Sequence, residues 1–473
     1  MANKIFTNTV WQVAIRAISV LVGVANLGLI TRILGQTNFG FYTTIFAFAQ
    51  MFMVLVDLGL YLTLLREVSS VDGRQEESRV TNNIFTIRFV SSLTFLALAP
   101  LAIQLFPYAP EVKTHLIYFI VAFFFQTLIT TLSAIFAKKL AMPKIAIADL
   151  VGKVFYLGLL AYLFFYNGSL KAVLFSNSVT QFLAFILIYL FLRKYIDLRF
   201  AWDFKFWKTI IYRTLPLALS VVLNLIYFKA DTLVLAAFVS PEEVALYGAP
   251  YRILEVLVTF PHMFLALILP ILTAAWLKKN VVKFREIWQN SFDFFVILTP
   301  AILITIWLIG RPLITTIAGA DFAASGAILN VLVLATVAIY FGTLLIYVVV
   351  ALSLQKEMIK YFLLTAAFGL TGYFIFIPRF SYWGAAWMTV ATEILIGVCA
   401  YLVIRKKLSL QTDFKIVWKS GEAALAALLV GWLLHNTHPI IMVLGALLVY
   451  VALMYFSKAI NKQKLQALLK RTD

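Results

Sequence analysis

Apolar runs of about 20 residues recur along the whole chain and are separated by short polar segments. As an α-helix, a run of this length spans the hydrocarbon core of a bilayer, which is roughly 30 Å thick. Fourteen such runs are present, and each predicts one membrane-spanning helix. They cover about residues 9–33, 40–64, 82–106, 114–137, 145–166, 170–192, 210–239, 244–275, 290–310, 325–352, 359–378, 382–404, 418–435 and 438–457. The pattern therefore predicts an all-α integral membrane protein with about 14 transmembrane helices.

Polar or small side chains recur at helical spacing inside four of these runs, so that they share one face of each predicted helix. The faces carry Asn8, Gln12, Arg16, Ser19, Gly23 and Asn26 in the first run; Gln50 and Asp57 in the second; Arg213, Ser220, Asn224, Tyr227 and Asp231 in the seventh; and Arg252, Glu255, Thr259 and His262 in the eighth. Such stripes favour a water-filled cavity between the helices. Polar side chains that only hold neighbouring helices together are the alternative. The polar run at residues 176–181 has the same two interpretations.

The turn after the first run and the turn after the seventh run look like copies of each other. Tyr42 and Tyr247, which end these turns, are 205 positions apart, and the same offset carries Asn26 onto Asp231. We therefore predict two six-helix repeats followed by two extra helices. The expected parts are a first lobe at residues 1–200, a second lobe at 201–408, and two spans with a basic tail at 409–473. Internal repeats are typical of secondary transporters, which place the substrate path at the repeat interface.

The composition excludes an ordinary soluble protein, since 63% of the residues are hydrophobic and only 13% are charged. The net charge of +18 alone is compatible with nucleic-acid binding, but the basic residues lie in short loops between the spans. With the N-terminus in the cytoplasm, 28 of the 39 Lys and Arg residues lie on the cytoplasmic side, 5 on the outer side and 6 within spans. This bias follows the positive-inside rule and predicts that both termini are cytoplasmic. Membrane lipids, not nucleic acid, are the expected contact.

The motifs of common enzyme and ATPase classes are missing from the sequence. There is no GxxxxGK[ST] stretch, no metal-ligand cluster and no nucleophile triad. The single cysteine, Cys399, excludes a disulfide within the chain and a cysteine-based metal cluster. We expect no cofactor and no enzymatic activity, so any energy for transport would come from an ion gradient or from the substrate gradient.

Several basic and amide residues within the spans are candidates for substrate binding. Arg16, Arg88 and Arg213 all lie in the cytoplasmic thirds of their spans, where guanidinium groups would hold phosphate. Snorkelling of these side chains to the inner lipid headgroups is the alternative. The expected substrate-binding set is Arg16, Arg88, Arg213, Arg252, Asn26 and Asn224.

Carboxylates within the spans are candidates for ion coupling. Asp231 and Arg252 are equally far from the turn between their helices, so they should lie level near the bilayer centre. Glu255 shares a face with Arg252, which suggests either an ion-pair switch or a purely structural pair. The expected ion-coupling set is Asp231, Glu255, Glu393 and Asp57.

Two further charges within the spans are expected to have structural partners. Asp149 and Lys153 are spaced i,i+4 and should form an ion pair. Lys229 is two residues from Asp231, so it should point away from that carboxylate, toward another helix or outward.

Short motifs give the chain a family resemblance over nearly its full length. They are TRILG at 31–35 with FGFY at 39–42, DLGL at 57–60 with Arg66 and Glu67, YFKAD at 227–231, and LYGAPYR at 246–252 with Pro261 and Pro270. In these motifs the chain resembles the polysaccharide flippases of the multidrug/oligosaccharidyl-lipid/polysaccharide exporter superfamily, which include the O-antigen translocases of the bacterial inner membrane.

The resemblance implies two six-helix lobes that alternate in access and a lipid-linked oligosaccharide substrate on an undecaprenyl pyrophosphate carrier. It also implies coupling to H⁺ or Na⁺ and contacts with other polysaccharide-assembly proteins. The related lipid II flippases carry arginines in a central cavity, and Arg16 and Arg252 lie in comparable spans. A drug or organic-cation antiporter of the same superfamily is the main alternative. A membrane-embedded polysaccharide polymerase or ligase and an uncoupled lipid scramblase are two others.

A double substitution tests the basic cavity that this resemblance implies. Arg16→Ala together with Arg252→Ala should impair polysaccharide export and leave drug resistance unchanged, because phosphate recognition needs the guanidinium groups. Export is measured in cells that carry only the variant. Normal export from a correctly inserted double variant would contradict the basic cavity.

Overall fold

The computed structural model describes residues 2–57 and 59–459, apart from some side chains within the helices. The undescribed side chains are those of residues 2–14, 54, 55, 57, 213 and 215–228. Three predicted site residues, Asp57, Arg213 and Asn224, therefore lie outside the described side chains.

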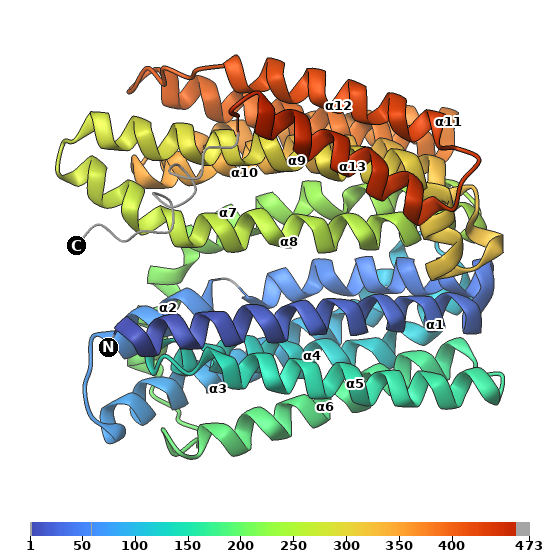
Figure 1. The fold of residues 1–473 in the computed structure, drawn as a ribbon. Coiled ribbons are helices and arrows are strands. Elements are labelled where there is room, and N and C mark those ends of the chain that lie inside the picture. The colour runs from blue at the N-terminus through green and yellow to red at the C-terminus, as the bar shows by residue number, and fades with distance from the viewer. Residues whose placement is uncertain (1, 58, 460–473) are drawn as a thin grey trace. The chain divides into compact units, whose positions relative to one another are not determined.

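The described residues form thirteen α-helices, two short 3₁₀-helices and no strand (Figure 1). The α-helices are α1 (Ala2–Asp57), α2 (Leu60–Ser69), α3 (Arg74–Ala102), α4 (Pro110–Lys138), α5 (Met142–Phe165), α6 (Leu170–Leu192), α7 (Phe204–Phe238), α8 (Pro241–Leu277), α9 (Val281–Ala318), α10 (Ser325–Ala351), α11 (Gln355–Arg405), α12 (Lys415–Leu433) and α13 (Pro439–Phe456). The 3₁₀-helices are η1 (Ile103–Leu105) and η2 (Ala320–Phe322). The predicted all-α fold is confirmed.

The fourteen expected spans lie on helices, although two long helices, α1 and α11, each carry two of them and the second span, 40–64, is divided between α1 and α2. The backbone of α1 turns at Gly35, which has φ 64°, and that of α11 turns at Ser381, which has φ 51°. Glycine adopts positive φ at little cost, whereas serine does so rarely. Eleven helices in the described part are long and apolar enough to cross a membrane, and two of these contain the paired spans. The chain is therefore a multi-pass membrane protein.

The chain divides into two compact units. The first unit comprises Met1–Gly248 and Ile317–Asp321, and the second comprises Ala249–Thr316 and Phe322–Asp473. The division into lobes at 1–200 and 201–408, with two further spans at 409–473, stays a prediction.

The first unit contains α1 to α7 and the first turns of α8. Figure 1 shows α1 alongside α5, and α4 packs against both α1 and α6. A buried apolar cluster joins α2, α3, α4 and α6 through residues such as Leu64, Ile84, Leu132 and Ile188. This packing holds α1, α4 and α6 together, and these three helices carry the candidate site described below.

Within the first unit, the turn after the first span rests on the start of α8. The backbone at Gly40 is so close to Pro241 that an added Cβ would lie 2.9 Å from the Pro241 Cα. Thr37 Oγ1 donates a hydrogen bond of 2.5 Å to Glu242 Oε1, and a Cβ at Gly248 would lie 2.7 Å from the Thr43 side chain.

The last two contacts each join residues that are 205 positions apart, which is the offset of the predicted repeat. The two-repeat organisation itself stays a prediction.

The short segment at 317–321 belongs to the first unit because the first helix binds its carbonyl groups. Arg32 donates a hydrogen bond to the Ile317 carbonyl, and Gln36 Nε2 donates one of 2.6 Å to the Asp321 carbonyl.

The second unit contains most of α8 and helices α9 to α13. Its core joins α8, α9, α10 and α11 through buried residues such as Leu265, Phe295, Leu344 and Ile404. Helices α12 and α13 pack against each other and onto α9. The Ser420 hydroxyl donates to the Val296 carbonyl at 2.8 Å, which fixes α12 on α9. The two predicted C-terminal spans therefore dock on the second unit.

The close approach at Gly40 gives a prediction about stability. Gly40→Ala should lower the free energy of unfolding by about 1–3 kcal/mol, because the new methyl group meets backbone atoms of Pro241 that cannot rotate away. Thermal unfolding of the purified protein in detergent measures this effect. Gly158→Ala is the matched control, since nothing lies within 4 Å of a Cβ at Gly158. Equal unfolding temperatures for the two variants would contradict the close contact.

Candidate functional site

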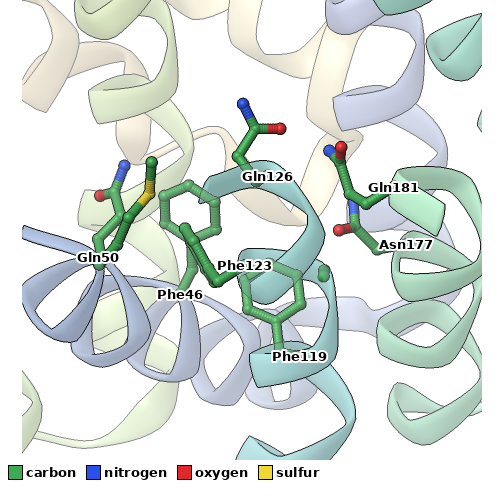
Figure 2. Close-up of a pocket in the computed structure, with 9 residues that line it drawn as sticks. Phe46, Gln50, Phe119, Phe123, Gln126, Asn177 and Gln181 are labelled. Atoms are coloured by element: carbon green, nitrogen blue, oxygen red, sulfur yellow. The ribbon is translucent and has the colours of Figure 1, made fainter. Parts of the chain in front are cut away.

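A cavity of about 270 Å³ lies between α1, α4 and α6 of the first unit (Figure 2). Helical spacing places its lining residues on one face of each helix, three or four positions apart. The lining residues are Phe46, Gln50 and Met53 of α1; Phe119, Ala122, Phe123 and Gln126 of α4; and Asn177 and Gln181 of α6. None of these nine residues is charged.

Four carboxamide side chains, those of Gln50, Gln126, Asn177 and Gln181, give the cavity its polar character. Gln50 Oε1 is buried and has no hydrogen-bond partner. Within the part of the chain that the structure describes, the side chains of the other three form no hydrogen bond either. A buried polar group without a partner costs about 1–3 kcal/mol. Native proteins rarely keep such groups unless water or a ligand binds them.

Three phenylalanine rings form the apolar part of the same cavity. The ring centroids of Phe46 and Phe119 are 5.6 Å apart, those of Phe46 and Phe123 are 5.7 Å apart, and those of Phe119 and Phe123 are 5.2 Å apart. Mutual ring contacts at these distances hold the side chains in fixed orientations. The cavity therefore combines rigid aromatic surfaces with carboxamides that are free to bind.

Lys229 of α7 contacts Phe46, one of the three phenylalanine rings of the cavity. Its side chain is only 5% exposed, and its Nζ is 5.9 Å from the centroid of the Phe46 ring. This confirms that Lys229 meets another helix, whereas the expectation that it points away from Asp231 stays a prediction.

Asp231 is one of the most deeply buried acidic side chains of the first unit, at 1% exposure. Tyr247 Oη donates a hydrogen bond of 2.6 Å to its Oδ2. The amide and the hydroxyl of Thr232 donate to its Oδ1 at 2.5 and 3.1 Å. These donors tie α7 to α8 around the carboxylate. The expectation that Asp231 and Arg252 lie level stays a prediction, because the two residues belong to different units.

The polar stripe of the first span contacts α5. Arg16 and Lys153 both bind the Asp149 carboxylate, at 3.5 and 3.1 Å, and Ser19 donates to it at 2.8 Å. The predicted Asp149–Lys153 pair is confirmed, and Asn26 donates to the Lys153 carbonyl at 3.2 Å. The Arg16 side chain is 46% exposed, and an ion pair this accessible contributes about 0–1 kcal/mol. Its guanidinium can therefore exchange this partner for another anion at little cost.

Arg88 has a different environment, because its side chain is completely buried. Its guanidinium donates to the Val56 carbonyl at 2.7 Å and to the Thr127 carbonyl at 3.3 Å, which joins α3 to α1 and α4. These are structural contacts. The phosphate-binding role expected for Arg88 stays a prediction, and it would need these contacts to rearrange.

The remaining candidates with described side chains lie in the second unit. Arg252 and Glu255 form an ion pair of 3.0 Å with about one fifth of each side chain exposed, which confirms that they share a face of α8. Glu393 of α11 is 6% exposed. The structure thus brings Arg252 and Glu255 together and places Glu393 in the packed interior of the same unit.

The sequence reasoning missed part of the cavity. Gln50 belongs to the polar face predicted for the second span, and Asn177 and Gln181 belong to the polar run at 176–181, which has two interpretations. The structure now places all three on the cavity wall. Gln126 and its aromatic neighbours were not recognised. The sequence does carry a signal for Gln126. It lies in an apolar run, seven residues after Phe119 and three after Phe123, and this spacing places the three side chains on one helical face.

Comparisons with known proteins agree on the class. Residues 5–277 match the family model described as "Polysaccharide biosynthesis protein", which covers more than half of the chain. No curated protein matches the chain at the level of sequence.

The fold is similar to several solved membrane transporters. The lipid II flippase MurJ in an inward closed conformation is 14% identical, with a TM-score of 0.79 over 95% of this chain and 99% of that one. A multidrug resistance MATE transporter in an inward-facing conformation is 14% identical, with a TM-score of 0.68 over 84% of this chain and 97% of that one. A MOP superfamily transporter from Pyrococcus furiosus is 13% identical, with a TM-score of 0.62 over 86% and 96%. At these identities the likeness establishes a shared fold.

The contact between Tyr247 and Asp231 generates a prediction. Tyr247→Phe should lower the free energy of unfolding by about 1–3 kcal/mol, because it removes a hydrogen bond from a buried carboxylate. Thermal unfolding in detergent measures the change. Tyr166→Phe is the control, since that side chain is 70% exposed. If Tyr247→Phe unfolds at the same temperature as the control, the hydroxyl does not stabilise the Asp231 carboxylate.

Proposed function

Because this chain belongs to the polysaccharide biosynthesis protein family, we propose that it flips lipid-linked oligosaccharide repeat units across the cytoplasmic membrane by alternating access. The observation that carries this proposal is the match of residues 5–277 to that family. The matched stretch includes the carboxamide cavity and the Asp231–Tyr247 contact. The fold shared with a lipid II flippase supports the same class of substrate.

The proposed substrate has three chemically different parts. Its undecaprenyl chain stays in the lipid, its pyrophosphate carries negative charge, and its glycan is polar. Arg16 is the best placed of the proposed phosphate contacts in the first unit, because it is half exposed and its ion pair is weak. Arg252 is the corresponding proposal in the second unit. Arg88, Arg213, Asn26 and Asn224 complete the proposed set.

Coupling to a gradient of H⁺ or Na⁺ is proposed to use buried carboxylates. Asp231 and Glu393 are both almost inaccessible to solvent. A carboxylate inside a membrane-spanning bundle is costly unless it is partnered, so binding and release of a cation can drive a rearrangement. Glu255 and Asp57 are the other proposed coupling residues. Asp231 is the preferred candidate, because its partners come from both α7 and α8.

The charge distribution supports a multi-pass protein of the bacterial inner membrane with both termini in the cytoplasm. Its proposed contacts are membrane lipids and other polysaccharide-assembly proteins. A drug or organic-cation antiporter is the second candidate, because the chain also shares the fold of a multidrug transporter. The uncharged lining of the cavity disfavours that role, since a cationic drug needs a carboxylate.

Reconstitution tests the proposal. Purified protein in proteoliposomes should expose lipid-linked oligosaccharide from the inner leaflet to an impermeant glycosidase outside. The rate at which the glycosidase cleaves this oligosaccharide should be at least about ten-fold higher than in protein-free vesicles. A ten-fold increase in rate corresponds to a translocation barrier that is lower by about 1.4 kcal/mol. Ionophores should slow the coupled reaction, whereas they would not affect a scramblase. Failure to translocate the oligosaccharide, combined with active efflux of a cationic dye, would contradict the proposal and favour the antiporter.

A further inference from the structure

We infer that the cavity between α1, α4 and α6 is a subsite for one uncharged sugar ring of the transported glycan. The inference rests on the proposed function and goes beyond it, because it assigns recognition of the sugar to named residues of the first unit. Those residues are Gln50, Gln126, Asn177 and Gln181, together with the rings of Phe46, Phe119 and Phe123.

The hydrogen-bonding capacity of the cavity matches a sugar. A carboxamide presents two N–H donors and a carbonyl acceptor, whereas a sugar hydroxyl both donates and accepts. Figure 2 shows the four carboxamides on three different helices around one space. Donors and acceptors that converge from several directions suit a ring that carries hydroxyl or acetamido groups on several carbons.

The cavity lacks the features that other parts of the substrate would need. Pyrophosphate binding needs positive charge, and none of the nine lining residues is charged. A polyprenyl chain would leave four carboxamides without hydrogen bonds. An acidic sugar would lack a cationic partner in the lining. An uncharged sugar such as a hexose or an N-acetylhexosamine satisfies both the polar and the aromatic surfaces, because its ring has polar edges and C–H faces.

A purely structural role would require the carboxamides to bond to one another or to neighbouring helices. That is how polar residues join helices in a membrane. Within the described part of the chain these four side chains form no such bond, and Gln50 Oε1 is buried without a partner. The desolvation of Gln50 Oε1 is therefore uncompensated until water or a ligand enters, and the half-buried carboxamides of Gln126, Asn177 and Gln181 keep their hydrogen-bonding capacity. The volume of about 270 Å³ is near the lower end of ligand pockets, which span roughly 300–1,000 Å³, and suits one ring rather than a whole repeat unit.

Near-isosteric substitutions separate the ligand role from a structural role. Gln50→Leu and Gln181→Leu should each lower oligosaccharide translocation in proteoliposomes about 5- to 10-fold, which is the loss of one hydrogen bond. Neither variant should lower the unfolding temperature, and Gln50→Leu should raise it, because it removes an uncompensated polar group. Gln104→Leu is the matched control, since Gln104 is exposed and outside the cavity. Lowered stability with unchanged translocation would overturn the subsite and assign the carboxamides to packing.

Protection of a cysteine identifies the part of the substrate that occupies the cavity. Asn177→Cys places a thiol on the cavity wall, and the wild-type protein gives the background, because its single cysteine, Cys399, is buried. Lipid-linked oligosaccharide extracted from the source cells should slow maleimide labelling of the variant at least about 5-fold, and undecaprenyl pyrophosphate alone should not.

Equal protection by both lipids would overturn the inference in favour of the carrier. Absence of protection by either lipid, while the same variant still translocates oligosaccharide, would also overturn it and leave the flippase proposal intact. A wild-type protein that does not translocate the oligosaccharide would overturn the proposed function and the subsite together.

Discussion

A polar group inside a membrane-spanning helical bundle must find its hydrogen-bond partner in the protein, in trapped water or in a ligand, because bulk water is absent. This constraint separates the buried polar residues of the chain into two kinds. Arg88 and Asp231 have partners on neighbouring helices, which lock those helices together. The carboxamides around the cavity have none in the described structure, and Gln50 is the clearest case. Partnered groups organise the fold. Buried atoms without a hydrogen-bond partner also occur outside the cavity, for example Asn26 Oδ1 and Asn330 Oδ1, so the feature that distinguishes the cavity is four carboxamides lining one space.

The first unit connects its cavity to its buried charges through a short series of contacts. The aromatic group of the cavity ends at Phe46, whose ring lies beneath Lys229. Lys229 is two residues from Asp231 on α7, and Asp231 accepts a hydrogen bond from Tyr247 at the start of α8. Ligand binding at the aromatic surface and cation binding at the carboxylate would therefore act on adjoining groups.

Periodicity predicted the elements well, because it reports how each helix is divided into polar and apolar faces. It located the spans, the second of which is divided between α1 and α2, and it predicted two ion pairs, Asp149–Lys153 and Arg252–Glu255, whose members lie on a single helix. It could not predict tertiary partners. Arg88 is one example, because the carbonyl groups that bind its guanidinium are 32 and 39 residues away in the sequence. Gln126 was missed for the same reason, because only packing of α4 against α1 and α6 shows which glutamines face a common cavity.

The most direct test of this account is an experimental structure of the protein bound to its lipid-linked oligosaccharide. The account predicts density for one sugar ring between α1, α4 and α6, with its hydroxyl groups within hydrogen-bonding distance of Gln50 and Gln181 and its face on the phenylalanine rings. A complex in which this cavity holds only water or an acyl chain, while the whole glycan binds elsewhere, would contradict it.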